Sequence, residues 1–143
     1  AFGYFLRQYF YELPQKHADW WYYGWKQVVG KVKEIESCCN DIIVADINGM
    51  PYIYFLFYSK YDPAKFQREA IRTYKADQFG FEHIEGYGKY LFQKDFVWRY
   101  VKDNLQDKTI YEVPAEQIDD NLGIVKTIYL PNNKPVYKII KNV

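Results

Sequence analysis

The residues best placed to bind a ligand lie in the segment from Asp46 to Tyr52. Asp46 ends a short β-branched run, Asn48-Gly49 is a turn signal, and Pro51 suits the first position of a helix. In α/β sheets, ligands tend to bind where strands end, and helix N-termini attract anions. We therefore predict a substrate-binding site at Asp46, Asn48, Gly49 and Tyr52. Two points weigh against it: the Asp46 carboxylate would repel an anion, and Asp46 and Asn48 could equally cap the turn.

The other chemically competent side chains form no recognisable catalytic pattern. Neither of the two serines lies in a Gly-x-Ser-x-Gly sequence. A thiol–imidazole pair would need Cys38 or Cys39 to meet His17 or His83, and nothing in the local sequence supports such a meeting. We therefore predict no catalytic residue in this chain.

Metal and cofactor sites are also not expected. His83 and Glu85 would share one face of a strand, but a catalytic zinc needs a third protein ligand and the sequence supplies none nearby. Gly86 and Gly88 resemble the start of a dinucleotide-binding sequence. Leu91 replaces its third glycine, however, and the residues that follow are typical of a strand, whereas that sequence must open a helix.

The charge pattern argues against a nucleic-acid partner. The chain has 19 basic and 18 acidic side chains, interleaved along its whole length, for a net charge of +1. Nucleic-acid binding depends on a clustered basic surface. With 49% hydrophobic and 26% charged residues, the chain should fold into a globular domain.

The first half of the chain has the sequence patterns of three helices and one strand. Helical spacing of large apolar residues predicts a helix over 19–36, capped by Asp19, and residues 41–46 read as a strand covered on both faces. The apolar run 52–58 fits a buried helix better than a strand, because Pro51 and a turn precede it. Asp62-Pro63 opens a further short helix that we expect to reach Ile71.

The second half is richer in strand signals. Alternation over 79–96 predicts a strand with a bend near Gly86, and residues 109–113 form another, followed by a turn or short helix at 115–118. A β-hairpin should close the chain, with strands 124–130 and 136–140. The expected fold is α/β: one compact domain over residues 1–143, with a mixed sheet flanked by helices and a C-terminal antiparallel hairpin.

Aromatic residues make up 21% of the chain, and 16 of them are tyrosines. Core and strand positions can account for many, since tyrosine and phenylalanine favour strands. The segment 1–11 is nonetheless dense in aromatics and is expected to end at Pro14, so residues 1–14 fit a membrane-proximal lead-in, where tyrosine gathers at the bilayer interface. The longest apolar run, 52–58, is too short to span a membrane.

Four stretches of the sequence are similar to one known family. They are Trp21-Tyr-Tyr-Gly-Trp-Lys-Gln-Val-Val29, Asp41-Ile-Ile-Val-Ala-Asp46, Pro51-Tyr-Ile-Tyr-Phe-Leu-Phe-Tyr-Ser-Lys-Tyr-Asp-Pro-Ala-Lys-Phe-Gln67 and Ile128-Tyr-Leu-Pro-Asn-Asn-Lys-Pro-Val136. Together they resemble the C-terminal extracytoplasmic soluble region of prokaryotic polytopic glycosyltransferases of the dolichyl-phosphate-mannose–protein mannosyltransferase type (family 39). The resemblance is strongest over 18–67 and 124–140 and loose over 70–108.

The resemblance implies a non-catalytic accessory domain on the outer face of a cell membrane. Family members transfer sugar from a polyprenyl-phosphate donor, and their catalytic carboxylate lies in an early loop with no counterpart here. The implied partners are the transmembrane portion of the same polypeptide, the membrane surface, and a glycan or polyprenyl-phosphate sugar. Two other functions stay open: a stand-alone carbohydrate- or protein-binding module using exposed aromatics, and a small enzyme with its site at Asp46–Tyr52.

Overall fold

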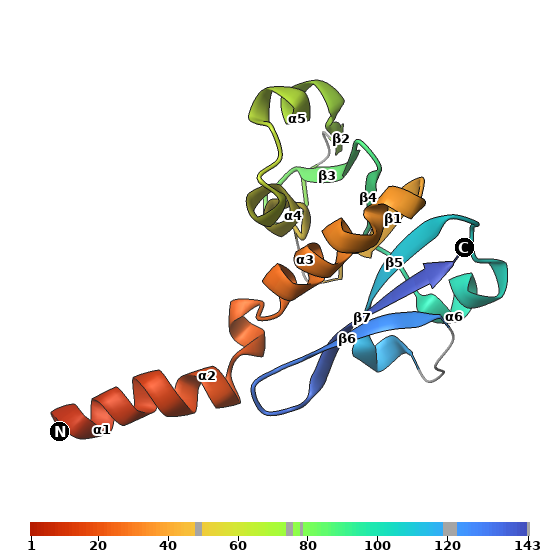
Figure 1. The fold of residues 1–143 in the computed structure, drawn as a ribbon. Coiled ribbons are helices and arrows are strands. Elements are labelled where there is room, and N and C mark those ends of the chain that lie inside the picture. The colour runs from red at the N-terminus through yellow and green to blue at the C-terminus, as the bar shows by residue number, and fades with distance from the viewer. Residues whose placement is uncertain (48–49, 74–75, 78, 119–122, 143) are drawn as a thin grey trace.

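The computed structural model describes residues 1–143 except 48–49, 74–75, 78, 119–122 and 143. As predicted, the fold is α/β, with one mixed sheet flanked by helices (Figure 1). The described strands follow the order β2-β3-β4-β1-β5-β7-β6 across the sheet. Their bounds are β1 Asp41–Ala45, β2 Ile71–Thr73, β3 His83–Tyr87, β4 Tyr90–Gln93, β5 Thr109–Pro114, β6 Ile124–Tyr129 and β7 Pro135–Asn142.

The centre of the sheet is parallel and its flanks are antiparallel. β1 runs parallel to both of its neighbours, so that Ile42 lies opposite Tyr90 of β4 and Ile110 of β5. Every residue of β1 after Asp41 is buried, which confirms the prediction of a strand covered on both faces. The C-terminal hairpin is also confirmed, because β6 and β7 are adjacent and antiparallel.

Helices and helical turns make up the rest of the regular structure. A long N-terminal helix precedes the sheet, and α3 and α4 cover one of the sheet's faces. The helices are α1 Phe2–Arg7, α2 Leu13–Lys16, α3 Trp25–Ile35, α4 Tyr52–Ser59, α5 Pro63–Glu69 and α6 Trp98–Val101; a π-helical turn spans Gln8–Glu12, and 3-10 turns span Asp19–Trp21, Glu36–Cys38, Lys102–Asn104 and Ala115–Gln117.

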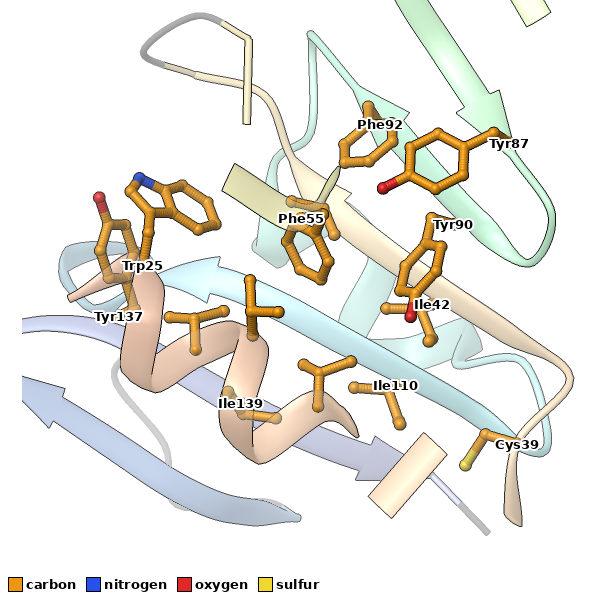
Figure 2. Close-up of a cluster of buried hydrophobic side chains, with 14 of the residues drawn as sticks. Trp25, Cys39, Ile42, Phe55, Tyr87, Tyr90, Phe92, Ile110, Tyr137 and Ile139 are labelled. Atoms are coloured by element: carbon orange, nitrogen blue, oxygen red, sulfur yellow. The ribbon is translucent and has the colours of Figure 1, made fainter. Parts of the chain in front are cut away.

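The larger core lies between the sheet and helices α3 and α4, and aromatic rings fill much of it (Figure 2). The ring of Trp25 in α3 packs 4.7 Å from Tyr137 and 6.1 Å from Phe55, measured between centroids. Phe55 continues the contact to Tyr90 at 5.3 Å. The interpretation of tyrosine as a core residue therefore holds for this part of the chain.

A smaller core covers the opposite face of the sheet, under α6 and the turn that follows β5. Trp98 and Phe96 pack there on Tyr111, and Ile43 and Ala45 of β1 point to the same side. The alternate residues of β1, Ile42 and Val44, belong to the larger core. The two faces of the central strand are thus buried under different elements, which fixes the position of its carboxyl end.

The helix predicted over 19–36 begins later than expected. Asp19 starts a single 3-10 turn, and the chain then leaves helical geometry, with φ of 52° at Tyr22 and 107° at Gly24, before α3 begins at Trp25. A Cβ on Gly24 would lie 3.1 Å from Ile128 and 3.2 Å from Tyr137. The close approach of this turn to β6 and β7 explains why the helix cannot extend back to Asp19.

The strand predicted over 79–96 is in fact a hairpin of β3 and β4. The chain reverses at Gly88, where φ is +55°, and Tyr87 pairs with Tyr90 across the turn. The helix opened by Asp62 and Pro63 is confirmed, and the Asp62 carboxylate caps it by accepting from the Lys65 amide at 2.6 Å. It ends at Glu69, however, because Ile71 joins the edge strand β2 instead.

Pro14 does not end the N-terminal segment as expected. The backbone stays helical from Phe2 to Lys16, and the π-helical turn Gln8–Glu12 ends two residues before the proline. A wider turn suits a residue that has no N–H to donate and whose ring crowds the preceding turn. The helix extends away from the sheet (Figure 1). In the described part of the chain, no helix combines the length and apolar content that a membrane span requires.

Candidate functional site

A hollow opens where β1 ends, and Asp46 lies in its wall. Asp46 is buried immediately after the last residue of β1, and its backbone amide donates to the Gln93 carbonyl of β4 at 2.9 Å. The volume of the hollow is about 440 Å³, within the usual range of small-molecule sites. It is lined by Asp46, Ile71, Thr73, His83, Ile84, Glu85, Leu91, Phe92, Gln93 and Lys94.

The sheet topology brings His83 to Asp46. β4 pairs with β1, and β3 returns antiparallel to β4, so the first residue of β3 lies near the end of β1. His83 is buried there, and its Nδ1 atom lies 3.9 Å from Asp46 Oδ2. Residues 37 positions apart in sequence thus share one site because two strand pairings connect them.

Asp77 holds the other side of the imidazole. Its Oδ2 atom lies 3.0 Å from His83 Nε2, and its Oδ1 accepts from the backbone amides of Phe79 at 2.8 Å and Phe81 at 3.0 Å. The amide of Gly80 donates to the Asp77 carbonyl and closes the turn. The Phe81 amide, the His83 ring and the Phe79 amide together lower the pKa of Asp77 to about 2.

This low pKa defines the hydrogen bonding of His83. An ionised Asp77 can only accept, so the His83 Nε2 atom carries the proton and donates to it. In the neutral imidazole, Nδ1 is then an acceptor directed toward Asp46. Among the described residues Nδ1 has no hydrogen-bond partner, although it is buried. A ligand that donates a hydrogen bond would satisfy it.

Further charged side chains surround this pair. Glu85 and Lys94 line the same hollow as Asp46, and Asp95 lines a neighbouring hollow of about 460 Å³ that also contains Asp46, Asp77, His83 and Lys94. The Thr73 hydroxyl donates to Glu85 and is therefore already engaged. Acidic groups outnumber basic ones, so the site disfavours anionic ligands.

On its other side the polar site adjoins an aromatic depression. His83 and Asp77 also line a hollow of about 610 Å³ whose walls are mainly apolar. Phe79 and Phe81, which the Asp77 turn holds in place, are both exposed at its rim. The remaining lining residues are Tyr22, Ile47, Met50, Ile53 and Tyr54. Carboxylates, an imidazole and exposed phenyl rings therefore meet in one place.

The predicted substrate site agrees only in part with this arrangement. Asp46 lies where the sequence placed it, whereas Asn48 and Gly49 lie outside the described residues. Tyr52 is half-buried in α4 and packs on Phe66 and Phe92, with ring centroids 6.4 and 6.3 Å apart, and it is not among the residues that line these hollows.

Sequence reasoning missed Asp77, Glu85 and Lys94 as members of the site. The sequence pattern indicates Glu85 only as a metal ligand beside His83, and in the structure both residues line one hollow. A usable signal existed for Asp77, because aspartate followed by glycine three residues later is typical of a type I turn. That signal predicts the turn, but not the histidine that it orients.

The hollow offers an oriented imidazole, carboxylates and one ammonium group to a ligand. The hydrogen bond to Asp77 holds the His83 imidazole as a carboxylate holds the histidine of a general base. The Thr73 hydroxyl lines the same hollow and donates its hydrogen bond to Glu85. Over the described residues, no group of three or more His, Cys, Asp or Glu side chains has a geometry that could hold a metal ion.

A second unusual surface is the N-terminal helix. None of its residues is buried, and its aromatic side chains project into solvent: Phe2, Tyr4, Phe5, Tyr9, Phe10 and Tyr11. Trp20 and Trp21, which follow it, are 70% and 73% exposed. Between the helix and the β6–β7 loop lies an apolar groove of about 430 Å³, lined by Tyr9, Phe10, Leu13, Pro14, Ala18, Trp21, Tyr23 and Pro131.

Comparison with known proteins identifies no relative. No protein-family model, no curated protein and no solved structure matches this chain.

Proposed function

We propose that this chain is the membrane-proximal extracytoplasmic accessory domain of an integral-membrane glycosyltransferase, with the catalytic centre elsewhere in the enzyme. The observation that carries the proposal is the exposed aromatic surface of the N-terminal helix. The resemblance of residues 18–67 and 124–140 to the family 39 C-terminal region supplies the link to sugar transfer.

The aromatic residues of this helix do not form a single stripe. Positions 2, 5, 9 and 10 lie on one side, whereas Tyr4 and Tyr11 lie on the other. Helices that are apolar around most of their circumference are normally covered, and soluble proteins rarely expose a continuous apolar patch of this kind. The helix therefore fits surroundings that are apolar on several sides.

A membrane interface fits this composition better than a protein core. Tyrosine and tryptophan gather at the level of the lipid headgroups, because their rings are apolar and their tips are polar. Arg7 and Lys16, both paired with Glu12 at 3.5 and 2.8 Å, have stems long enough to reach the polar headgroups. The exposed Trp20 and Trp21 extend the same surface toward the sheet.

Vesicle binding tests the membrane part of the proposal. The chain should bind to vesicles of phosphatidylcholine and phosphatidylglycerol. Binding should shift the fluorescence emission of Trp20 and Trp21 to the blue, and brominated lipid should quench that emission. The double variant Phe5→Ser/Phe10→Ser should lower the partition coefficient at least about tenfold, because two exposed phenyl rings lose their apolar surroundings.

The matched control replaces two aromatics that lie outside the N-terminal helix and are at least as exposed. Phe57→Ser/Tyr100→Ser should bind vesicles as the unmodified chain does. Equal loss in both double variants, or no binding at all, would contradict membrane placement. Sedimentation without lipid adds a further check: a stable dimer that is lost in Phe5→Ser/Phe10→Ser would instead assign the surface to a second copy of the chain.

An immunoblot tests whether the domain belongs to a larger enzyme. An antibody raised against this chain should detect, in fractionated source cells, a band much larger than 17.3 kDa in the membrane pellet. A soluble band at the size of the chain itself would refute the accessory-domain proposal and leave a stand-alone binding module as the better explanation.

A further inference from the structure

We propose that the hollow of about 460 Å³ lined by Asp46, His83 and Phe79 binds a neutral sugar ring, with sugar hydroxyls on the carboxylates and the imidazole and one face of the ring on Phe79. No part of this inference depends on membrane placement, because it concerns a different surface and is measured without lipid.

The polar atoms that His83 and Asp46 offer in this hollow are hydrogen-bond acceptors. Asp77 fixes the proton of His83 on Nε2, so Nδ1 of the neutral ring can only accept a hydrogen bond. The nearest Asp46 carboxylate oxygen is 3.9 Å away and also only accepts when ionised. The buried Nδ1 atom has no hydrogen-bond partner among the described residues, so a sugar hydroxyl can donate to it while a neighbouring hydroxyl donates to a carboxylate.

The charge around the hollow favours an uncharged ligand over an anion. The polar part of the site contains four carboxylates, those of Asp46, Asp77, Glu85 and Asp95, against the single ammonium of Lys94. A phosphate or carboxylate ligand would meet this excess of negative charge at short range. Lys94 can still donate to a ring or hydroxyl oxygen, so donors and acceptors are both present for an uncharged polyol.

Two exposed phenyl rings lie beside these polar groups. Phe79 is 73% exposed and Phe81 is also exposed, yet hydrogen bonds from their amides to Asp77 hold the turn that carries them. The C–H groups on one face of a pyranose are apolar and pack on an aromatic face, while the hydroxyls at its edge stay polar. The turn at Asp77 therefore couples the aromatic surface to the orientation of His83.

Nuclear magnetic resonance can test this inference on the chain as it is. Titration with methyl glycosides of glucose, mannose and galactose should give saturable shifts in the amides of Asp46, Asp77 and Phe79 and in the ring nitrogens of His83. At least one of the three sugars should bind. Phe79→Ala should weaken that binding about tenfold.

Phe57→Ala is the matched control, because Phe57 is also 73% exposed but lies in α4 away from the hollow. It should bind the sugar as the unmodified chain does, and neither variant should lose stability, because both rings project into solvent. Equal affinities of the two variants would overturn the inference, as would the absence of saturable shifts with all three sugars.

Charged analogues separate a neutral-sugar site from other possibilities. Glucose 6-phosphate should bind more weakly than the neutral glucoside. Glucosamine should gain no more than a fewfold advantage from its ammonium. If glucosamine binds more than about tenfold tighter, the hollow is a cation site; if the phosphate binds tighter, the charge argument is wrong. Either result refutes the inference while leaving the vesicle experiment unaffected.

Discussion

Replacing Glu112 by glutamine should remove a strong pH dependence from the stability of the fold. Glu112 lies in β5 on the side of the larger core, opposite Val44 and Ile139, and it is fully buried. Neither of its carboxyl oxygens has a hydrogen-bond partner among the described residues. Burial raises the pKa of Glu112 to about 8, against a smaller opposing effect of the Ala45 backbone.

The direction of the effect follows from proton binding. Between the unfolded value of 4.5 and the folded value of about 8, the native state holds a proton at Glu112 that the unfolded state has lost. The free energy of unfolding therefore falls as the pH rises through this window. Below the window Glu112 is protonated in both states and does not make the stability depend on pH. At about 1.4 kcal/mol per pKa unit the full effect is about 5 kcal/mol, of which about 3 kcal/mol develops between pH ~5 and ~7.5.

Urea unfolding followed by circular dichroism measures this difference directly. Near pH 5 the free energies of unfolding of Glu112→Gln and of the unmodified chain should agree within about 1 kcal/mol. Near pH 7.5 the difference in favour of Glu112→Gln should be larger by about 3 kcal/mol, because glutamine stays neutral. Glu116→Gln, at an exposed carboxylate just beyond the same strand, is the control and should follow the unmodified chain at both pH values. A stability difference between Glu112→Gln and the unmodified chain that does not change with pH would refute the argument.

Three further predictions concern the cap of α5 and two glycines. Asp62→Ala removes the cap of α5 and should lower the free energy of unfolding by about 1 kcal/mol in urea titration, with Asp103→Asn as an exposed control expected to change nothing. Gly86→Ala should destabilise the fold by about 1–3 kcal/mol, because its Cβ would lie 2.7 Å from the Tyr90 carbonyl oxygen. Gly30→Ala should raise the melting temperature instead, because α3 is open around Gly30 and alanine favours a helix; a drop in both alanine variants would contradict the packing argument.

The parts of the fold that the sequence predicts well depend on local patterns. The buried run at Ile42–Ala45, the Asp62 cap and the C-terminal hairpin each follow from neighbouring residues alone. The late start of α3 does not, because helical spacing begins before Trp25 and the packing of Gly24 against Ile128 and Tyr137 excludes the earlier turn. Likewise the local sequence predicts that Ile71 is helical, but its pairing with β3 makes it part of a strand.

The candidate site shows the same limit more clearly. Asp46 could be found because it follows a recognisable strand, whereas the role of His83 depends on the pairing of β4 with β1 and of β3 with β4. Asp77 enters only through the turn that places its carboxylate against the imidazole. A site assembled by long-range strand pairing leaves little trace in the spacing of its residues.

The position of β1 also determines when the fold can form during synthesis. Both neighbours of β1 in the sheet, β4 and β5, are made much later than β1 itself, so the middle of the sheet cannot assemble until residue 114 has emerged. Until then the apolar faces of α3 and α4 have no sheet to cover. Folding that waits for distant segments is slow and leaves apolar surface exposed to other chains. We therefore expect nascent chains stopped before β5 to need chaperone protection that the completed chain does not.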